Sequence, residues 1–98
     1  MKVDAASVTV VNNTGANRFE IRVGEHVCVL EYELRGETLY FTHTGVPPAL
    51  EGQGLAGRLA QTGLEYARGH SFKVVPACEF MHVYIRRHPE YNDLVKKF

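Results

Sequence analysis

A run of small residues, Glu51-Gly52-Gln53-Gly54-Leu55-Ala56-Gly57-Arg58-Leu59, stands where the sequence predicts the start of a helix. Small side chains there leave the first backbone N–H groups of the helix bare. Bare N–H groups and the positive end of the helix dipole together favour a bound phosphate. A glycine inside a helix lowers the stability by about 0.5–1 kcal/mol relative to alanine, so the presence of both Gly54 and Gly57 needs an explanation. We predict a phosphate cradle, and the alternative is that the glycines serve loop geometry and packing.

A thiol follows the glycine run, at the end of the short apolar stretch Val74-Val75-Pro76-Ala77-Cys78. The thiolate is the reactive form of cysteine, and a helix N-terminus or a nearby cation raises its fraction. Cys78 stands where a second helix is expected to begin, so it is either a reactive thiol or a small buried hydrophobic residue. Cys28 lies within an apolar strand, and we expect it to serve packing. A phosphate cradle and a thiol on neighbouring elements suggest an enzyme that handles a phosphorylated group carrier.

The size and charge of the chain exclude several classes of protein. Its 98 residues fit one domain, residues 1–98, and its 11 basic and 11 acidic residues cancel. Without a basic excess we expect no nucleic acid as partner. The apolar runs are far shorter than the ~20 residues of a membrane span, and no signal peptide is recognisable, so we expect no membrane and a cytoplasmic location. The cysteines and histidines show no metal-ligand spacing, and we predict no metal site.

The first half of the chain predicts an antiparallel meander. β-Branched residues and alternating apolar residues mark successive strands, separated by Asn, Gly and charged turn residues. Phe19, Ile21 and Val23 alternate with charged residues, which indicates a half-buried strand. The strands are expected at residues 6–11, 18–23, 27–34 and 38–44, with turns at residues 12–15, 24–25 and 35–37.

Helices interrupt the strands in the second half. Pro47-Pro48 prevents a continuing central strand, and apolar residues then follow helical spacing from Gly54 to Arg68. We predict a fifth strand at Phe72–Pro76 and a second helix at Glu79–Arg87, which ends before Pro89. Tyr91–Phe98 is expected to add a helical turn or two. The order ββββ-α-β-α indicates the α+β class, with helices packed on one sheet.

The glycine run resembles the acetyl-CoA pyrophosphate loop of the GNAT N-acetyltransferases, whose pattern is Arg/Gln-x-x-Gly-x-Gly/Ala. Residues 51–56 match it except at the first position, where Glu51 stands. The stretches 43–47, 74–78 and 84–91 resemble the short single-domain GNAT-like proteins of about 100 residues. The resemblance covers residues 17–95 and implies the GNAT-like, acyl-CoA N-acyltransferase fold.

The resemblance implies where acetyl-CoA or CoA would bind. The cofactor lies in a cleft where the fourth and fifth strands splay apart, and its pantetheine arm pairs with the backbone of Thr44, Gly45 and Val46. Its pyrophosphate sits on the N–H groups of Gln53 to Gly57, and Glu51 is expected to face solvent. Arg86-Arg87 either reach the 3′-phosphate of CoA or form a solvated helix end. The cofactor-binding residues implied beyond the fourth strand are Gly52, Gln53, Gly54, Leu55, Ala56, Gly57 and Arg58.

Three residues are the candidates for chemistry that the resemblance implies. Cys78 lies near the thioester, where it either accepts the acetyl group or only lines the pocket. His43, at the end of the fourth strand, either takes a proton from the amine or from Cys78, or makes only local contacts. Tyr84 resembles the tyrosine that protonates the departing CoA thiolate, although a core aromatic residue explains it equally well. Some family members carry an acidic residue where this chain has Gly45.

We therefore predict an N-acetyltransferase that moves the acetyl group of acetyl-CoA to a primary amine, either a protein lysine or a small amine. The alternative is a module that binds CoA or acetyl-CoA with little or no catalysis. A third possibility is an interaction domain without cofactor binding, against which the intact glycine run argues. We expect a monomer or a weak homodimer. The identity of the acceptor does not follow from the sequence.

Overall fold

The computed structural model describes all 98 residues, which form one five-stranded sheet with helices on it. The strands lie in the order of the sequence, and the first four pair antiparallel. The fifth strand pairs parallel to the fourth, after a helical crossover. The α+β class and the meander are thereby confirmed. The strands are β1 (Val11–Asn13), β2 (Arg18–Val23), β3 (His26–Arg35), β4 (Thr38–Gly45) and β5 (Lys73–Pro76).

Two α-helices and three short 3-10 helices complete the fold. The helix α1 spans Leu55–Gly69, one residue later than predicted, and α2 spans Glu79–Arg87 as predicted. The 3-10 helices are η1 (Thr14–Ala16), η2 (Pro48–Leu50) and η3 (Pro89–Leu94). Proline stands at the first position of both η2 and η3, where its missing N–H and fixed φ suit a helix start.

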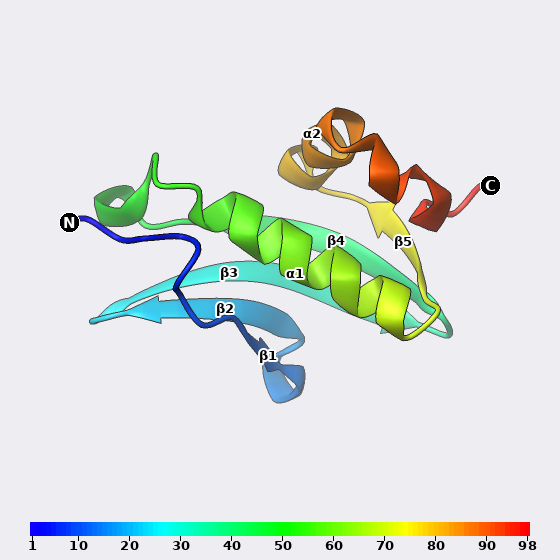
Figure 1. The fold of residues 1–98 in the computed structure, drawn as a ribbon. Coiled ribbons are helices and arrows are strands. Elements are labelled where there is room, and N and C mark those ends of the chain that lie inside the picture. Colours follow the sequence, from blue (N-terminus) through cyan, green and yellow to red (C-terminus); the bar gives the residue numbers. More distant parts are fainter.

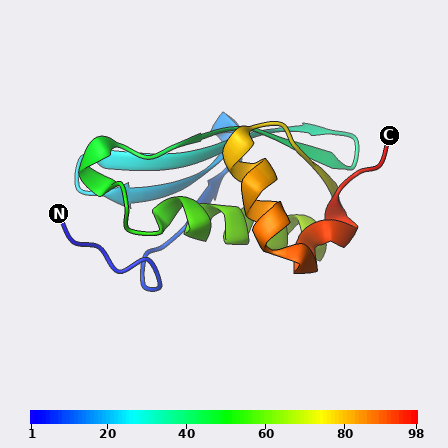
Figure 2. The ribbon, with the colours of Figure 1, turned by 90° about the horizontal axis from the view of Figure 1, so that it is seen from above.

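Both α-helices lie on the same side of the sheet (Figures 1 and 2). We call this side the helix side and the opposite one, which no helix covers, the open side. Strand residues on the helix side are buried against α1 and α2 and form one apolar core. The core residues of the strands are Phe19, Ile21, Cys28, Leu30, Tyr32, Leu39, Phe41 and Val74, and those of the two helices are Leu55, Leu59, Ala60, Leu64, Ala67, Met81 and Ile85. Cys28 is fully buried, as expected of a packing residue.

The helix α1 approaches the sheet most closely at Gly63. A Cβ at that position would lie 3.0 Å from Cδ2 of Leu30 and 3.1 Å from Cε1 of Phe41. Both neighbours are fully buried and cannot move into solvent. The absence of a side chain at residue 63 therefore sets the distance between α1 and the sheet, and with it the position of the glycine run at the start of α1.

A β-bulge in β4 changes which side its last residues face. Tyr32 pairs with Phe41 and Glu31 pairs with His43, so Thr42 is an extra residue in β4. Beyond the bulge, Thr44 pairs with the core residue Leu30, and it therefore faces the helix side, whereas His43 faces the open side.

The strands β4 and β5 separate at Phe41, directly before the bulge. Their last paired residues are Phe41 and Pro76. The carbonyl oxygen of Phe41 accepts the N–H groups of both Ala77 (2.9 Å) and Cys78 (3.0 Å), and the chain then leaves the sheet into α2. Residues 42–45 of β4 have no partner on that edge, which agrees with the predicted cleft between strands four and five.

Three predicted boundaries were wrong. The first strand covers Val11–Asn13 rather than residues 6–11, and Asn12 and Asn13 belong to it rather than to the turn. β-Branched residues at positions 8–11 favoured a strand, but residues 8–10 run along the edge of the core without a partner strand. The helical turn predicted within residues 91–98 is η3, which begins earlier, at Pro89, ends at Leu94 rather than Phe98, and is followed by a single parallel bridge between Val74 and Val95. No helix is long and apolar enough to cross a membrane.

Glu20 is the unexpected residue of β2. The alternation in the sequence placed it on the polar side of a half-buried strand, yet only 3% of it is exposed. Arg18 (2.6 Å), Arg22 (3.0 Å) and Asn13 (3.2 Å) all donate hydrogen bonds to its carboxylate, and they cover it on the open side. The hydrogen bond from Arg18 is the largest of the effects that lower the pKa of Glu20, against the opposing effect of burial.

The substitution Gly63→Ala should destabilise the fold by about 1–3 kcal/mol, because the added methyl group overpacks the contact with Leu30 and Phe41. Gly69→Ala is the matched control at the other end of α1. A Cβ there meets nothing within 4 Å, and a gain of up to about 1 kcal/mol is expected. Urea denaturation measures both free energies of unfolding, and equal values for the two variants would contradict the close approach at Gly63.

Glu20 should stabilise the fold only where it is ionised. Its pKa in the folded chain is lowered from 4.5, so its contribution is fully present above that value and is lost as the pH falls through the lower folded pKa. In Glu20→Gln the loss of stability should be largest at neutral pH and should shrink below about pH 4.5. Denaturant unfolding of both proteins at several pH values tests this, and a difference that stays constant with pH would contradict it.

Candidate functional site

The loop before α1 presents a continuous row of unsatisfied backbone donors. No protein group accepts a hydrogen bond from the N–H groups of Gly52 to Gly57, and the first N–H that returns to the helix is that of Arg58, bonded to the carbonyl of Gly54. Gly52 (φ +77°) and Gly54 (φ +79°) adopt the left-handed conformation that glycine tolerates best. The first turn of α1 carries no acidic side chain. These features suit a phosphate group.

A cavity of about 410 Å³ lies against this loop. Val46 lines it from the end of β4, and Phe80 lines it from the first turn of α2. Phe80 is exposed, although it is large and apolar, and the sequence analysis did not single it out. Its place two residues after Cys78 in a predicted helix was the available signal. The other lining residues are Glu51, Gly52, Gly54, Leu55, Ala56 and Gly57, which include most of the predicted pyrophosphate loop.

The side chain of Gln53 points away from the cofactor loop to the beginning of the chain. Its Oε1 accepts the N–H of Val3 (2.6 Å), and its Nε2 donates to the carbonyl of Met1 (2.7 Å). The first residues therefore lie beside the start of α1 (Figure 1), where Ala5 approaches Gly54. Only the backbone of Gln53 is free to contact a ligand, and its side chain fixes the loop.

A second cavity, of about 400 Å³, shares Gly54 and Gly57 with the first and extends to α2. Tyr84 lines it, and the ring of Tyr84 lies 3.8 Å from a Cβ position at Gly57. His88 stacks on this ring at 3.9 Å between centroids and 16° between planes. The Nδ1 of His88 lies 2.8 Å from the carbonyl of Tyr84, one turn earlier. Tyr84 thus lies next to the glycine loop, and it also packs against the apolar core.

The phenol of Tyr84 is suited to keep its proton. Burial, together with the charges of Glu90 and Glu65, raises its pKa above the ordinary value of about 10. Its hydroxyl has no hydrogen-bond partner in the protein. A protonated and unpartnered hydroxyl at the edge of the cavity is available as a proton donor.

Cys78 faces the helix side of the gap between β4 and β5. It is the N-cap residue of α2, its side chain makes no capping hydrogen bond, and it is half-buried. Its Sγ lies 3.4 Å from Oγ1 of Thr44, so one of the two groups can donate to the other. The neighbouring Glu79 is exposed. Two predicted site residues, Thr44 from the pantetheine stretch and Cys78, are therefore in direct contact.

His43 faces the open side and so lies across β4 from Cys78. It pairs directly with Glu31 of β3, whereas its neighbour Thr44 faces the helix side with Leu30. A direct proton transfer from Cys78 to His43 does not fit this arrangement, because the backbone of β4 stands between them. Transfer from an amine that arrives on the open side remains compatible with it.

The missing side chain at Gly45 leaves room for the imidazole of His43. A Cβ at residue 45 would lie 3.1 Å from Nε2 of His43, which is tighter than ordinary contact. The ring therefore leans along β4 over Gly45, toward the end of the strand where Val46 begins the cavity. His43 is exposed and has no hydrogen-bond partner in the protein. The position of the His43 ring thus depends on the absence of a side chain at residue 45.

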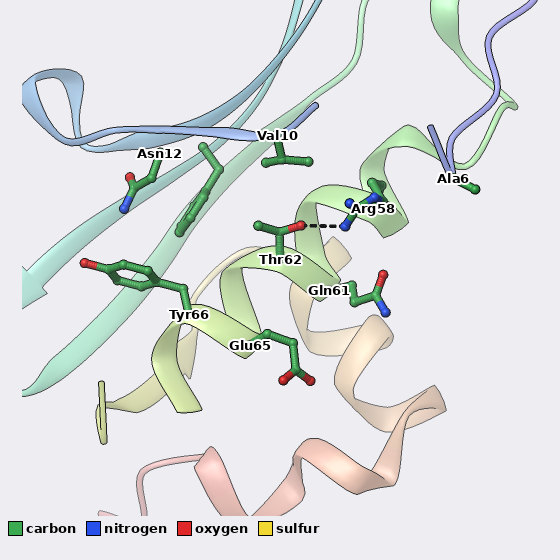
Figure 3. Close-up of a pocket in the computed structure, with 9 residues that line it drawn as sticks. Ala6, Val10, Asn12, Arg58, Gln61, Thr62, Glu65 and Tyr66 are labelled. Atoms are coloured by element: carbon green, nitrogen blue, oxygen red, sulfur yellow. Dashed lines mark hydrogen bonds between the residues drawn. The ribbon is translucent and has the colours of Figure 1, made fainter. Parts of the chain in front are cut away.

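The largest cavity, about 760 Å³, lies elsewhere, between α1 and the chain that leads into β1 (Figure 3). Arg58, predicted to bind the cofactor, points along this flank of α1, and its Nη1 donates to Oγ1 of Thr62 at 2.9 Å. Arg58 also lines the second cavity, so a contact with the cofactor at that edge remains a prediction. The remaining lining residues are Ala6, Val10, Asn12, Phe19, Gln61, Glu65 and Tyr66.

The other predicted positions differ in how close they lie to the cavities at the loop. Arg86 and Arg87 are exposed in the last turn of α2, which fits a solvated helix end and leaves a role toward the 3′-phosphate untested. Glu51 is exposed, yet it borders the first cavity. Thr44, Gly45 and Val46 end β4 and connect it to the loop, as the resemblance implies.

Comparisons with known proteins agree with this geometry. Residues 18–94 match the sequence profile of the family described as GCN5-related N-acetyl-transferase. Protein NATD1 of Xenopus tropicalis is 30% identical over 88 residues, which cover 87% of this chain and 81% of that protein. The solution NMR structure of a GCN5-like protein from Staphylococcus aureus superposes with a TM-score of 0.73 at 24% identity, over 95% of this chain and 92% of that one. This last likeness concerns the fold.

Proposed function

The chain belongs to the GCN5-related N-acetyltransferase family, and from that premise we propose that it transfers an acetyl group from acetyl-CoA to a primary amine. Acetyl-CoA supplies the acetyl group as a thioester, whose C–S bond is exchanged for the C–N bond of an amide. The observation that carries the proposal is the row of free N–H groups from Gly52 to Gly57, next to a cavity that Val46, just after β4, and Phe80 of α2 also line.

The residues around the loop fit the cofactor. The free amides and the N-terminus of α1 would hold the pyrophosphate, since they concentrate donors and positive potential. Val46 and Phe80 would flank the pantetheine arm with apolar surface. The backbone of Thr44 to Val46 would pair with its amide groups, because this edge of β4 has lost its partner strand.

His43 is the proposed proton acceptor for the amine. It stands on the open side of β4, and the helix side is taken up by Cys78 and Thr44. An amine that enters from the open side meets His43 before it reaches the gap between the strands. An ammonium acceptor loses two protons in the reaction: the imidazole of His43 would take one, and the other would restore the proton that Tyr84 gives to the sulfur of CoA.

Tyr84 is the proposed proton donor to the leaving sulfur of CoA, so that the sulfur does not carry a full negative charge. Its raised pKa keeps the phenol protonated, and its hydroxyl lacks a partner in the protein. Cys78 would line the thioester pocket or accept the acetyl group in an S-acetyl form before the amine does. The contact between its Sγ and Thr44 Oγ1 supports a role at the reacting end of the cleft.

A binding module without efficient catalysis is the second candidate. Two features favour it. Where some family members carry an acidic side chain, this chain has Gly45, and the open side of the sheet has no helix to shape an acceptor site. The acceptor we propose is a lysine side chain of a protein or a small amine. We also propose a monomer or a weak homodimer and a cytoplasmic location.

Acetyl-CoA should raise the melting temperature of the protein. Ligand at 100 times its dissociation constant adds about 2.7 kcal/mol, which for a domain of this size corresponds to roughly ten degrees or more. Gly57→Glu should abolish the shift, because a carboxylate would stand among the free amides. Gly69→Glu, the same change at the far end of α1, should keep it. A shift that survives in Gly57→Glu, or is absent from the wild type, would contradict the cofactor site.

Substitutions at the three candidate residues should separate their roles. His43→Gln and Tyr84→Phe should each lower kcat by about 10²–10³-fold while the shift in melting temperature with acetyl-CoA persists. Cys78→Ala should lower kcat to a similar extent if the thiol accepts the acetyl group, and only a few fold if it lines the pocket. Mass spectrometry of the protein mixed with acetyl-CoA alone distinguishes these, because only the first leaves an acetyl group on Cys78.

The assay uses a blocked lysine peptide and a linear diamine as acceptors, and follows the release of free CoA thiol. Cofactor binding without turnover on either acceptor would favour the binding module. If His43→Gln leaves turnover unchanged, the proposed role of His43 is overturned, whereas the proposed acetyltransferase activity stands.

A further inference from the structure

We propose that Glu31 selects positively charged acceptors by holding their ammonium group next to His43 on the open side of the sheet. This inference rests on the proposed acetyl transfer and names the class of acceptor, an alkylammonium. Glu31 is in the middle of β3 and was not among the residues that the sequence analysis considered.

Glu31 is a carboxylate of the open side that forms no ion pair within the protein. Glu20 is held by Arg18 and Arg22, and Glu33, two residues along β3, is paired with Arg35 at 3.0 Å. Arg18 pairs with Glu31 in the strand register, yet its guanidinium is engaged by Glu20 at 2.6 Å and makes no ion pair with Glu31. The half-buried carboxylate of Glu31 therefore lacks a partner and would gain from one.

Glu31 and His43 are direct partners across β3 and β4. Side chains of directly opposed residues lie on the same side of a sheet, with their Cβ atoms about 4.5–5.5 Å apart. Neither side chain has a hydrogen-bond partner within the protein. Thr42, the extra residue of the bulge, donates its hydroxyl to the backbone carbonyl of Glu31 at 3.4 Å, which ties the bulge to this residue.

The two side chains match the needs of an alkylammonium. Such a group has three N–H donors and a positive charge, and it requires acceptors. The Glu31 carboxylate supplies charge and acceptor oxygens, and neutral His43 supplies a nitrogen that accepts a proton. The pair lies one residue from Thr44, which contacts Cys78 on the other side of β4. An ammonium held by Glu31 would thus wait beside the gap between β4 and β5.

The test compares acceptors of different charge in Glu31→Gln and in the matched control Glu33→Gln. The acceptors are a lysine peptide with blocked ends, a linear diamine, and an aromatic amine that is uncharged at neutral pH. In Glu31→Gln we expect KM for the two alkylammonium acceptors to rise about three- to tenfold, with little change in kcat. KM for the aromatic amine should stay constant, and Glu33→Gln should behave as the wild type.

Melting temperatures with and without acetyl-CoA establish that both variants fold and bind the cofactor. A rise in KM for only the peptide or only the diamine supports Glu31 and identifies which source of the ammonium the site accepts. An equal rise for the aromatic amine, or no rise for any acceptor, overturns the inference while acetyl transfer stands. A wild type that acetylates none of the three acceptors overturns the proposed function and this inference together.

Discussion

The carbonyl oxygen of Phe41 accepts the last hydrogen bonds between β4 and β5, from the amides of Ala77 and Cys78. Two donors on one acceptor end the ladder abruptly, and the chain turns out of the sheet into α2. Beyond this point β4 keeps one neighbour, β3, and its other edge is free. The cleft, the position of Cys78 at the start of α2 and the exposed edge of β4 all depend on this end of the pairing.

A rigid frame surrounds this opening. The close approach of α1 at Gly63 holds the helix against Leu30 and Phe41, so the start of α1 has a fixed position relative to the end of β4. At the other end of the loop, Gln53 binds the first residues of the chain through its side chain. The glycine loop is therefore held from both ends, while its own N–H groups remain unused. Preorganised donors of this kind bind an anion without first having to be ordered.

The sequence predicted the features that depend on local patterns. Periodicity and turn residues defined the order of the elements, and Pro89 defined the end of α2. The glycine run indicated the loop, because few other structures need so many small residues at a helix start. The resemblance then implied the residues of the cleft; among them, Val46 lines the cavity at the glycine loop, and Thr44 contacts Cys78.

The features that were missed depend on register and on contacts far apart in the chain. Residues 8–10 read as a strand because their side chains are β-branched, but no neighbouring strand is available to pair with them. The burial of Glu20 follows from two arginines on its own strand and an asparagine from β1. Glu31 reads as one polar residue of an alternating strand, and only the pairing with His43 connects it to the site.

The bulge at Thr42 lets β4 hold one residue more than the stretch of β3 opposite it, while His43 and Thr44 keep their sides of the sheet. Side chains alternate between the two sides of a strand, so the same residues paired regularly after Phe41, without the bulge, would turn His43 toward the helices and Thr44 toward solvent. In the gene, loss of the codon for Thr42 would remove the extra residue and leave His43 opposite Glu31, whereas one further residue before His43 would shift His43 and Thr44 by one position. This short segment should therefore tolerate the loss of Thr42 better than the gain of a residue.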